Sequence, residues 1–317
     1  MFLTGGSGFF GGWLLDSFVH ANHTLDLKAS VVVLTRDPER FHAARSNSVL
    51  DSSVTLHAGD IRNFDFPSGH FSHIIHAATP SNGVLKPETL LDIIIDGTRR
   101  VLDFALHSGA RRFLLTSSGA VYGKQPPDVA RVAEGSAGAP DTMNPDSAYS
   151  EGKRVAELLC AIYSSAHGIE TTIARCFAFV GPRLPLDAHF AAGNFIRDSL
   201  AGGPIRVRGD GATVRSFLYA ADLATWLWTI LFSGDSCRPY NVGSDHEITI
   251  EDLARAVGKL RPEVGVEIGR KAAPGAQPDR YVPDVTRANE ELGVTQSVEL
   301  ADALSRTSRW AREGQNR

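Results

Sequence analysis

Short apolar segments alternate with helix-like segments from the N-terminus to Gly181. The apolar segments are continuous rather than interrupted by polar residues, which predicts strands buried on both faces of a sheet. They lie at residues 2–3, 29–35, 54–58, 73–77, 112–116 and 171–177. Between them apolar residues recur at helical spacing, most clearly over 86–108 and 149–167. Strands that alternate with helices in this way predict an α/β fold with a doubly wound parallel sheet.

The pattern changes after Gly181 and Pro182 and becomes mixed in type. Helices are predicted near 195–200, 226–232, 250–260 and 298–311, with a glycine-rich turn at 209–211. The stretch 125–145 is rich in proline and glycine and precedes the predicted helix of Tyr149. We expect it to be a loop, and loops of this length often cover a functional site.

The composition removes several classes of function. Hydrophobic residues make up 43% and charged residues 21% of the 317 residues, as in ordinary soluble proteins. The net charge of -4, without a basic run, argues against nucleic acid as a partner. No apolar stretch approaches the roughly 20 residues of a membrane span. Three widely spaced cysteines and unclustered histidines give no metal-type spacing, so we expect a cytoplasmic protein without a metal.

A glycine motif follows the first predicted strand, at the start of the first helix. Gly5, Gly8 and Gly11 form Gly-x-x-Gly-x-x-Gly, and Phe9 and Phe10 belong to the same turn. Glycine permits a tight turn and lets a pyrophosphate approach backbone N–H groups at the positive end of a helix. The alternative is a plain glycine-rich turn. The position between strand and helix favours dinucleotide binding.

The end of the second predicted strand bears on the choice of dinucleotide. An NAD site usually has Asp or Glu there to hold the ribose hydroxyls. Thr35 occupies that position here, and Arg36 could pair with a 2′-phosphate. This favours NADP over NAD, although Asp37 could reach a ribose and Arg36 could be a plain surface residue. Further cofactor contacts are expected where the third and fourth strands end, at Asp60, Ile61, Ala77 and Ala78.

Three polar residues are candidates for the chemistry. Ser118 follows the strand at 112–116, at the carboxyl edge where such sheets bind ligands. Tyr149 and Lys153 are one helical turn apart and share a face. Tyrosine has a pKa of about 10, and we expect the nearby ammonium to lower the pKa of Tyr149 and favour proton transfer. Taken alone, each motif also occurs by chance in capped strands and amphipathic helices.

In combination these motifs resemble the extended short-chain dehydrogenase/reductases of the nucleotide-sugar epimerase/dehydratase family. The likeness continues through Arg175-Cys-Phe-Ala-Phe-Val-Gly-Pro182, Asn194-Phe-Ile196, Arg215-Ser-Phe-Leu-Tyr-Ala-Ala-Asp222, Tyr240-Asn-Val-Gly243 and Asp279-Arg280-Tyr281, and so covers nearly the whole chain. Ser-Glu-Gly-Lys-Arg-Val-Ala-Glu, from Ser150, is especially similar to the UDP-glucuronate decarboxylase branch.

The resemblance implies a Rossmann domain at 1–178, joined again by about 216–242, and a smaller C-terminal α/β substrate domain at 179–215 and 243–317. It implies NADP or NAD as cofactor, a nucleoside-diphosphate sugar as substrate, and a homodimer through the helices at 86–108 and 149–167. The residue roles that it implies are as follows: Tyr149 as acid/base, Lys153 as ribose anchor, Ser118 as substrate hydrogen-bond partner, Cys176 on the cofactor side, Asn194 and Phe195 near the nucleotide base, and Arg215 and Arg280 on the diphosphate.

Departures from the family pattern narrow the activity. Dehydratases of the family carry an Asp-Glu pair after the active-site hydroxyl residue, where this chain has Gly119 and Ala120. The decarboxylase branch keeps a Glu at the position of Ala120. Ile94 and Ala178 stand where the family usually has Asn. The substrate side of the site is therefore simplified.

Three hypotheses remain from the sequence. The first is an NAD(P)-dependent oxidoreductase that reduces a 4-keto sugar or epimerises C4 of a nucleotide sugar. The second is a decarboxylase or dehydratase whose acid is supplied from elsewhere, such as Glu134 or Glu151. Glu151 is two residues from Tyr149 and points away from it on a helix, which disfavours this hypothesis. The third is a nucleotide-binding regulator without turnover, motivated by Ile94 and Ala178.

Overall fold

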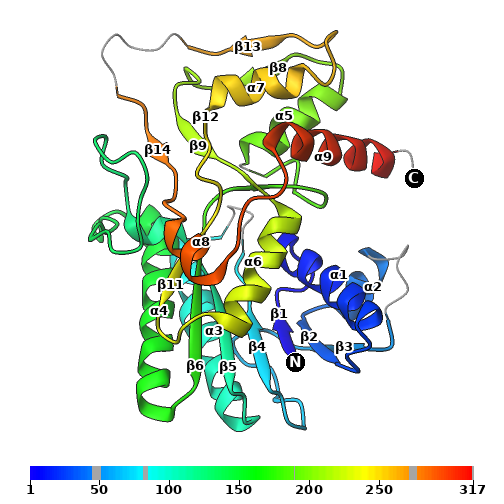
Figure 1. The fold of residues 1–317 in the computed structure, drawn as a ribbon, viewed down its shortest axis with the longest axis vertical. Helices are drawn as coiled ribbons and strands as arrows, with labels where there is room; N and C mark the ends of the chain where they lie inside the picture. The colour runs from blue at the N-terminus through cyan, green and yellow to red at the C-terminus, as the bar shows by residue number, and fades with distance from the viewer. Residues whose placement is uncertain (45–50, 81–84, 189, 271–276, 316–317) are drawn as a thin grey trace.

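The computed structural model describes residues 1–44, 51–80, 85–188, 190–270 and 277–315. Within this part of the chain, seven parallel strands form one sheet in the order β11-β6-β5-β4-β1-β2-β3 (Figure 1). The strands are β1 (Phe2–Thr4), β2 (Val31–Thr35), β3 (Val54–Ala58), β4 (His73–His76), β5 (Arg112–Ser118), β6 (Glu170–Cys176) and β11 (Pro239–Val242). The predicted doubly wound parallel sheet is confirmed.

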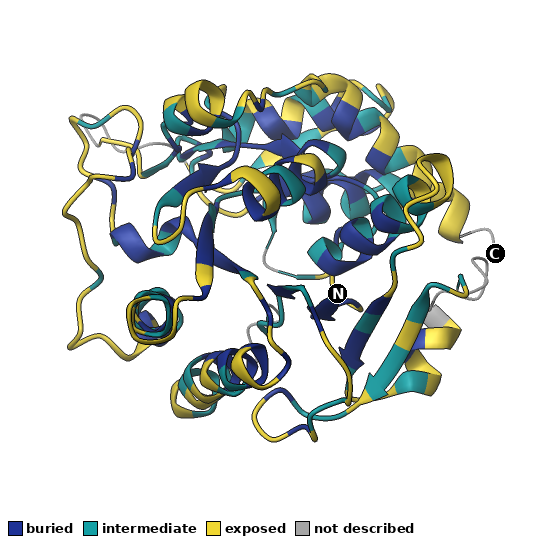
Figure 2. Cartoon of the chain, turned by 60° about the horizontal axis from the view of Figure 1, so that its bottom comes forward, coloured by how far each residue is buried: buried dark blue, intermediate teal, exposed yellow. Residues whose placement is uncertain are grey.

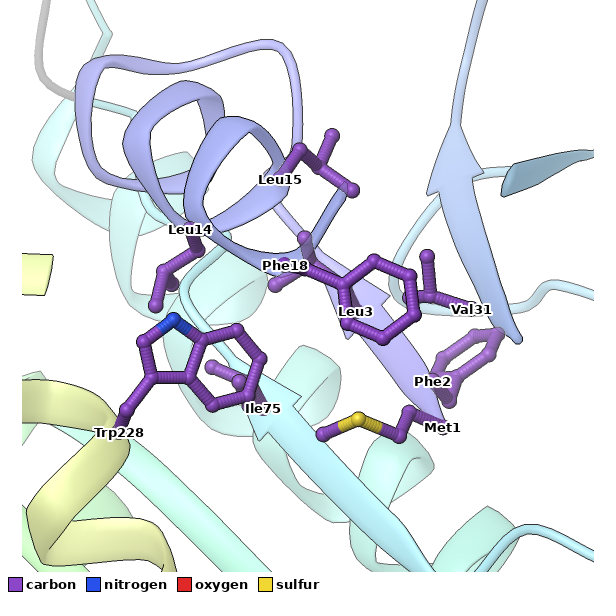
Figure 3. A pocket seen from close by; sticks show the side chains of 9 residues that line it. All are labelled: Met1, Phe2, Leu3, Leu14, Leu15, Phe18, Val31, Ile75 and Trp228. Atoms are coloured by element: carbon purple, nitrogen blue, oxygen red, sulfur yellow. The ribbon is translucent and has the colours of Figure 1, made fainter. Parts of the chain in front are cut away.

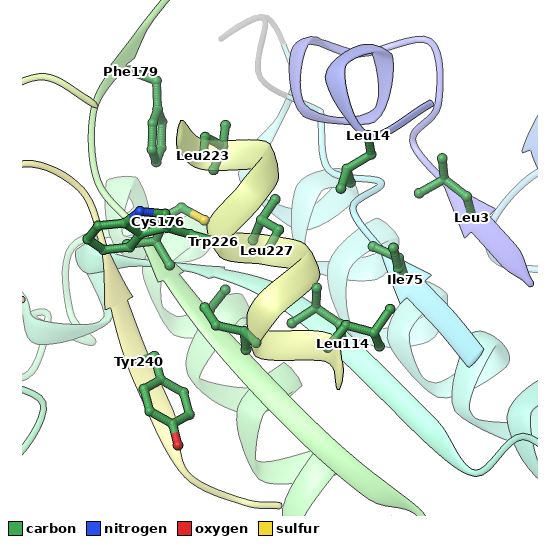
Figure 4. Close-up of a cluster of buried hydrophobic side chains, with 14 of the residues drawn as sticks. Leu3, Leu14, Ile75, Leu114, Cys176, Phe179, Leu223, Trp226, Leu227 and Tyr240 are labelled. Carbon is green, nitrogen blue, oxygen red and sulfur yellow. The ribbon is translucent and has the colours of Figure 1, made fainter. Parts of the chain in front are cut away.

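Helices cover both faces of this sheet and enclose two apolar cores. The helices are α1 (Phe9–Thr24), α2 (Pro38–Ala44), α3 (Pro87–His107), α4 (Ala148–His167) and α6 (Ala220–Ser233). One core joins α1 and α6 to the sheet through Leu14, Leu114 and Trp226 (Figure 4). The other joins α3 and α4 to the opposite face through Ile94, Leu115 and Ala156. Figure 2 shows buried strands between helices whose outer faces are exposed.

A third core lies in the remainder of the chain, drawn above the large sheet in Figure 1. It is built mainly by α5 (Ala191–Leu200), β8 (Ile205–Val207), α7 (Ile250–Gly258), β13 (Val266–Ile268) and α9 (Leu300–Gln315). A three-stranded sheet joins β9 (Val214–Ser216) to β12 (Glu247–Thr249) and β14 (Arg280–Tyr281). The shorter elements are β7 (Phe179–Val180), β10 (Leu218–Tyr219), α8 (Thr286–Leu292), η1 (Gly119–Tyr122) and η2 (Pro145–Ser147).

Most of the predicted strands and helices are present, but several short elements were not predicted. Each predicted strand of the large sheet is present, and the loop at 125–145 precedes η2 and α4 as expected. The predicted helices at 195–200 and 226–232 begin earlier, at Ala191 and Ala220. The helices α2 and α8 were not predicted as elements, because each has only seven residues. The sheet strand β11 was not predicted either, because Asn241 interrupts its apolar residues.

A small apolar cavity lies beside β1. Its volume is about 10 Å³, and its lining includes Phe2, Leu14, Ile75 and Trp228 (Figure 3). A space of this size holds at most one water molecule, and its apolar walls offer that water no partner. The cavity is therefore a packing gap in the core. Across the described residues, no helix has both the length and the apolar character needed to cross a membrane.

Candidate active site

The glycine turn lies at the carboxyl edge of the sheet, between β1 and α1. Gly5 has a φ of 76°, a left-handed conformation that favours glycine. A Cβ at Gly5 would lie 2.5 Å from the carbonyl oxygen of Ala77, and one at Gly11 would lie 2.2 Å from that of Gly5. The first turn of α1 contains no acidic residue. The turn therefore fits an anionic diphosphate, because its backbone can be approached closely and the helix end is positive.

Phe9 and Phe10 begin α1 but direct their rings into the protein. The two ring centres are 5.9 Å apart, and the Phe10 ring packs edge-on against Phe179 at 5.1 Å. Both side chains contact the apolar cores. They anchor the start of α1, so any cofactor contact from them would come from the backbone.

A buried histidine supports the glycine turn, and it was not among the predicted site residues. His76 ends β4, with Nδ1 2.8 Å from the Thr4 hydroxyl and Nε2 3.2 Å from the Thr98 hydroxyl. Thr98 donates its own proton to the carbonyl of Ile94, so Nε2 carries the imidazole proton and Nδ1 accepts from Thr4. Burial lowers the pKa of His76 to about 3, so the ring is neutral. The sequence does show His76 as a polar residue in an otherwise apolar predicted strand, which could have marked it as a site residue.

The predicted ribose-binding residues lie at the ends of β2 and β3. The Thr35 hydroxyl bonds the backbone of Asp37, and Arg36 is exposed. Asp60 accepts hydrogen bonds from the Arg62 side chain, which lower the pKa of Asp60, and the charge of Arg36 adds a small effect in the same direction. The structure therefore brings two guanidinium groups and one carboxylate to this edge, and Arg62 is the member that was not predicted.

The other residues predicted to contact the cofactor are Ala77, Ala78 and Ile61, and they pack close to the glycine turn and to α3. The backbone N–H of Ala78 donates to the Thr4 hydroxyl at 3.1 Å, and the carbonyl of Ala77 faces Gly5. Ile61 is buried, and a Cβ on Gly97 of α3 would lie only 3.0 Å from its side chain. Ile61 thus packs against α3 rather than lying free in the site.

Ser118 is the last residue of β5 and lies between two tyrosines. Its hydroxyl accepts a hydrogen bond from the N–H of Ala120 at 3.1 Å and so caps η1. The same hydroxyl interacts with the phenols of Tyr149 and Tyr281. The structure therefore joins Ser118 to Tyr149, as predicted, and adds Tyr281 from β14. Tyr281 belongs to a motif that carries the family resemblance, but no role was predicted for it.

Tyr149 lies in the first turn of α4, after a start that η2 and Asn144 organise. Removal of water raises the pKa of Tyr149, and the hydrogen bond with Ser118 opposes this effect. The prediction that Lys153 lowers the pKa of Tyr149 is therefore wrong in this structure. The Lys153 ammonium lies 6.0 Å from the centre of the Tyr149 ring, and its hydrogen bonds go elsewhere. Tyr149 is a neutral phenol here and can donate a proton.

Lys153 is buried on the same face of α4. Its ammonium donates to the Thr79 hydroxyl at 2.7 Å and to the carbonyl of Thr116 at 2.8 Å. Burial lowers the pKa of Lys153 to about 8, so the side chain titrates near neutral pH. Cys176, opposite Ser118 in the β5–β6 register, is a buried thiol whose pKa burial raises to about 12. Lys153 is thus the cationic group of this edge, while Cys176 stays neutral.

An aromatic ring fills the space where dehydratases carry an acid. A Cβ on Gly119 would lie 2.6 Å from the ring of Phe177. The ring centre of Phe177 is in turn 4.6 Å from that of Tyr281. A side chain at position 119 would therefore displace Phe177, in agreement with the interpretation that this site lacks those acids.

The alternative acids of the second hypothesis are engaged in other contacts. Glu134 accepts from the N–H of Asn241 at 2.9 Å and lies 3.7 Å from the Arg287 guanidinium. Glu151 pairs with Arg154 at 3.5 Å. Both carboxylates have structural partners, so neither is presented as a free acid.

The three-stranded sheet separates the two arginines that were predicted to bind diphosphate. Tyr281 pairs with Arg215 across β14 and β9, so their side chains share one face. The Arg215 guanidinium lies 5.7 Å from the centre of the Tyr281 ring. Arg280 is one position before Tyr281 and faces the other way, where it pairs with Glu247. Arg215 therefore lies with Tyr281 near Ser118, whereas Arg280 does not join it.

Other predicted substrate residues have mixed positions. Asn194 on α5 is partly exposed and bonds Arg197 at 3.3 Å. Phe195 is buried in the third core, so its ring packs inside the protein. Ile94 also has a packing role, because it contacts Gly152 of α4 at a distance that leaves little room for a Cβ there. These side chains explain the fold more than they explain recognition of a ligand.

Comparison with known proteins identifies the class. Residues 1–243 match the model of the NAD dependent epimerase/dehydratase family, and the chain belongs to that family. The chain is 32% identical over 309 residues to UDP-glucuronic acid decarboxylase 6 of Arabidopsis thaliana, covering 95% of this chain and 85% of that protein. The resemblance seen in the sequence is confirmed, and the chain is an NAD(P)-dependent enzyme of the extended short-chain type.

Solved structures agree with the fold. DesIV, a dTDP-glucose 4,6-dehydratase from Streptomyces venezuelae with NAD bound, superposes with a TM-score of 0.80 at 26% identity, covering 99% of this chain and 97% of that one. UDP-glucuronic acid 4-epimerase from Bacillus cereus superposes with a TM-score of 0.82 at 21% identity, covering 98% and 96%. The second likeness concerns the fold alone.

Proposed function

We propose that this enzyme transfers a hydride at C4 of a nucleoside-diphosphate sugar, with Tyr149 as acid/base. The observation that carries the proposal is the convergence of Ser118, Tyr149 and Lys153 at the carboxyl edge of the sheet, beside the glycine turn. The absence of acids at Gly119 and Ala120 leaves a site suited to reactions that need only this set, such as 4-keto reduction or C4 epimerisation.

Each residue has a defined part in moving the proton. The Tyr149 phenol, held neutral by its surroundings, gives its proton to the C4 oxygen when a ketone is reduced and takes it back in the reverse direction. The Ser118 hydroxyl holds the same oxygen. Lys153 stays cationic below a pH of about 8 and keeps a positive charge one helical turn from Tyr149, on the same face of α4.

The dinucleotide, when bound, supplies the hydride donor or acceptor. The turn of Gly5, Gly8 and Gly11 would hold its diphosphate, and Lys153 would hold a ribose hydroxyl. We propose NADP as the preferred form, because Arg36 and Arg62 present positive charge at the end of β2 and β3 and Thr35 offers no carboxylate. Asp60 reduces this preference, since its charge opposes that of a 2′-phosphate.

The substrate would lie between a Rossmann domain (1–178 with about 216–242) and a substrate domain (179–215 and 243–317). Arg215 is the proposed diphosphate anchor, because a guanidinium forks onto phosphate oxygens. Burial lowers the pKa of Arg215. Tyr281 and Phe177 would form an aromatic wall beside the sugar. Asn194 is a proposed contact to the nucleotide base. Arg280 is not part of the proposed site, because it pairs with Glu247 on the other face of the small sheet.

A substrate assay tests the reaction. Purified enzyme is incubated with a nucleotide-linked 4-keto sugar and NADPH, and loss of reduced-nicotinamide absorbance supports the reductase. Conversion of a nucleotide hexose into its C4 epimer without added cofactor supports the epimerase instead. Failure of both reactions, with a cofactor-loaded enzyme, would contradict the proposal.

A second candidate follows from the similarity to UDP-glucuronic acid decarboxylases. With NAD as hydride acceptor and Tyr149 as proton acceptor, oxidation at C4 of UDP-glucuronate would place a ketone β to the carboxylate. The β-keto acid would then lose carbon dioxide as the electrons of the C5–C6 bond form an enolate, which takes up a proton from water at C5. This loss needs no catalytic carboxylic acid, so Gly119 and Ala120 do not forbid it. Release of carbon dioxide from UDP-glucuronate with NAD would establish this activity.

A homodimer through α3 and α4 is the proposed assembly. Leu158 and Ile162 are 59% and 49% exposed on α4, and Leu106 is exposed on α3. Neighbouring apolar residues on the outside of two adjacent helices favour association with a second copy. Light scattering of the enzyme and of Leu158→Asp would test it, since the charged variant should be a monomer.

A further inference from the structure

Glu157 is a buried carboxylate on α4, the helix that carries Tyr149 and Lys153. Glu157 follows Lys153 by one helical turn and Tyr149 by two, so the three side chains share a face of α4. Its side chain is only 12% exposed. The Ser117 hydroxyl donates to it at 2.5 Å, and Arg175 of β6 donates through Nη2 at 2.6 Å and Nε at 3.0 Å. Glu157 thus ties α4 to β5 and β6 together.

Arg175 extends these contacts toward the loop after Ser118. Its Nη1 donates to the Tyr122 hydroxyl at 2.9 Å and to the carbonyl of Glu134 at 3.2 Å. Tyr122 ends η1, the short helix that Ser118 caps, and its hydroxyl donates to Asn241 at 2.8 Å. The network therefore reaches both the residue before Ser118 and the helix after it.

We propose that Glu157 is a positioning residue, which fixes the spacing between α4 and β5 and places a carboxylate on the same face of α4 as Lys153. The inference rests on the proposed function of Lys153 and Tyr149. A buried ion pair is a costly way to join elements, because an apolar contact of similar size is often at least as stabilising. Directed hydrogen bonds from Ser117 and Arg175 to one carboxylate, one helical turn from Lys153, fix the positions of three elements in a way that an apolar contact cannot.

The charged and titratable groups around Lys153 support this role. They come from α4 (Tyr149, Glu157 and Cys160), from β6 (Cys176) and from β4 (His76). Burial is the largest effect on Lys153 and lowers its pKa to about 8, while Cys176, Glu157 and Cys160 act in the opposite direction. The thiols and His76 are neutral near pH 7, since burial raises the thiol pKa values and lowers that of His76. Glu157 is therefore the anionic member of this group, and the Arg175 guanidinium of β6 pairs with it at 2.6 Å.

Loss of the Glu157 carboxylate should change the pH dependence of the enzyme. Removing the carboxylate lowers the pKa of Lys153 further, so the ammonium is lost at a lower pH than in the native enzyme. The alkaline limb of cofactor affinity and of activity then moves to lower pH. The test compares Glu157→Gln, Glu157→Asp and the control Asp222→Asn, a buried carboxylate of α6 whose hydrogen bonds go to Ser297 and Val298.

Affinity for reduced dinucleotide is measured by fluorescence across pH, together with kcat, KM and Tm. We expect Glu157→Gln to shift the alkaline limb and lower kcat by about 10- to 100-fold, because the reacting groups lose their fixed spacing. Glu157→Asp should keep the limb but lower kcat, since the charge stays and its reach shortens. Asp222→Asn should lower Tm without moving the limb.

If Glu157→Gln lowers Tm but leaves the alkaline limb of the pH profile unshifted, Glu157 has only a structural role and the inference is overturned. If Glu157→Gln does not fold, Glu157→Asp decides, because native kcat in that variant would also overturn it. Wild-type enzyme that binds no dinucleotide would refute the proposed function instead, so the two failures are distinguishable.

Discussion

The edge of the seven-stranded sheet and the small sheet β12-β9-β14 both face the proposed site, but they prepare their side chains differently. At the large sheet, Lys153 and Ser118 are buried and held by protein hydrogen bonds. At the small sheet, Arg215 bonds the carbonyl of Val214, and no carboxylate of the described residues lies within ion-pair distance of it. The side chains of the first region are held by hydrogen bonds within the protein, whereas the second region presents a guanidinium without a carboxylate partner among the described residues.

The largest effect is expected at the large sheet. Tyr149→Phe removes the proton-transferring hydroxyl and should lower kcat by about 10²- to 10⁴-fold with cofactor affinity retained. Tyr163→Phe is the matched control on the same helix, because its hydroxyl bonds Asp103 away from the site. Turnover and dinucleotide titration measure both. Near-native turnover in Tyr149→Phe would mean that another group moves the proton.

The second prediction compares the two arginines of the small sheet. Arg215→Ala should raise KM for the nucleotide sugar by about 10- to 100-fold, the amount expected for a lost charge-assisted hydrogen bond. Arg280→Ala should change KM little, since Arg280 pairs with Glu247 on the opposite face. Steady-state kinetics of both variants decide the matter. A larger KM effect at Arg280 would mean that Arg280, and not Arg215, binds the diphosphate.

Tyr281 lies where the two regions meet, so its removal should have an intermediate effect. Tyr281→Phe keeps the ring against Phe177 and loses the hydroxyl beside Ser118. We expect a kcat about tenfold lower at unchanged cofactor affinity, in the range of a lost hydrogen bond. If kcat and KM are unchanged, the Tyr281 hydroxyl has no part in the reaction and the residue only packs against Phe177. Stability by thermal melting serves as the control.

The smallest effect is expected at the exposed end of the cofactor site. Arg36→Ala should weaken NADPH binding severalfold and leave NADH binding nearly unchanged, because exposed charge interactions are screened. Parallel titrations with the two nucleotides provide the measurement. Arg62→Ala is the useful comparison, since Arg62 also bonds Asp60. Equal losses for NADH and NADPH in Arg36→Ala would contradict the NADP preference.

The sequence predicted six of the seven strands of the large sheet, because each of the six contains an apolar run between helical periods. It missed β11, whose short sequence Pro-Tyr-Asn-Val contains Asn241. The helices α2 and α8 were missed because each has only seven residues, too few to show a period. The glycine turn and the set of Ser118, Tyr149 and Lys153 are recognisable from residue type and spacing, because the chemistry demands both. The structure brings these residues to one edge of the sheet, as the sequence predicted, and their roles in catalysis are the proposal made above.

The small sheet shows what the sequence could not specify. Arg215 and Arg280 have the same chemistry, and only the pairing of β14 with β9 decides which one faces the site. A strand of two residues carries no alternation from which that register could be inferred. The pKa of Tyr149 was misjudged for a related reason, because spacing along a helix does not reveal how much water surrounds the phenol.

The contact between Phe177 and Gly119 has a consequence for how related activities can interconvert. Installing a carboxylate at position 119 alone would collide with the ring, and shrinking Phe177 alone would leave a gap beside Tyr281. The two changes are expected to be tolerated together and harmful apart. A mutational route from this enzyme to one with an acid at that position therefore passes through an impaired intermediate, whichever change comes first.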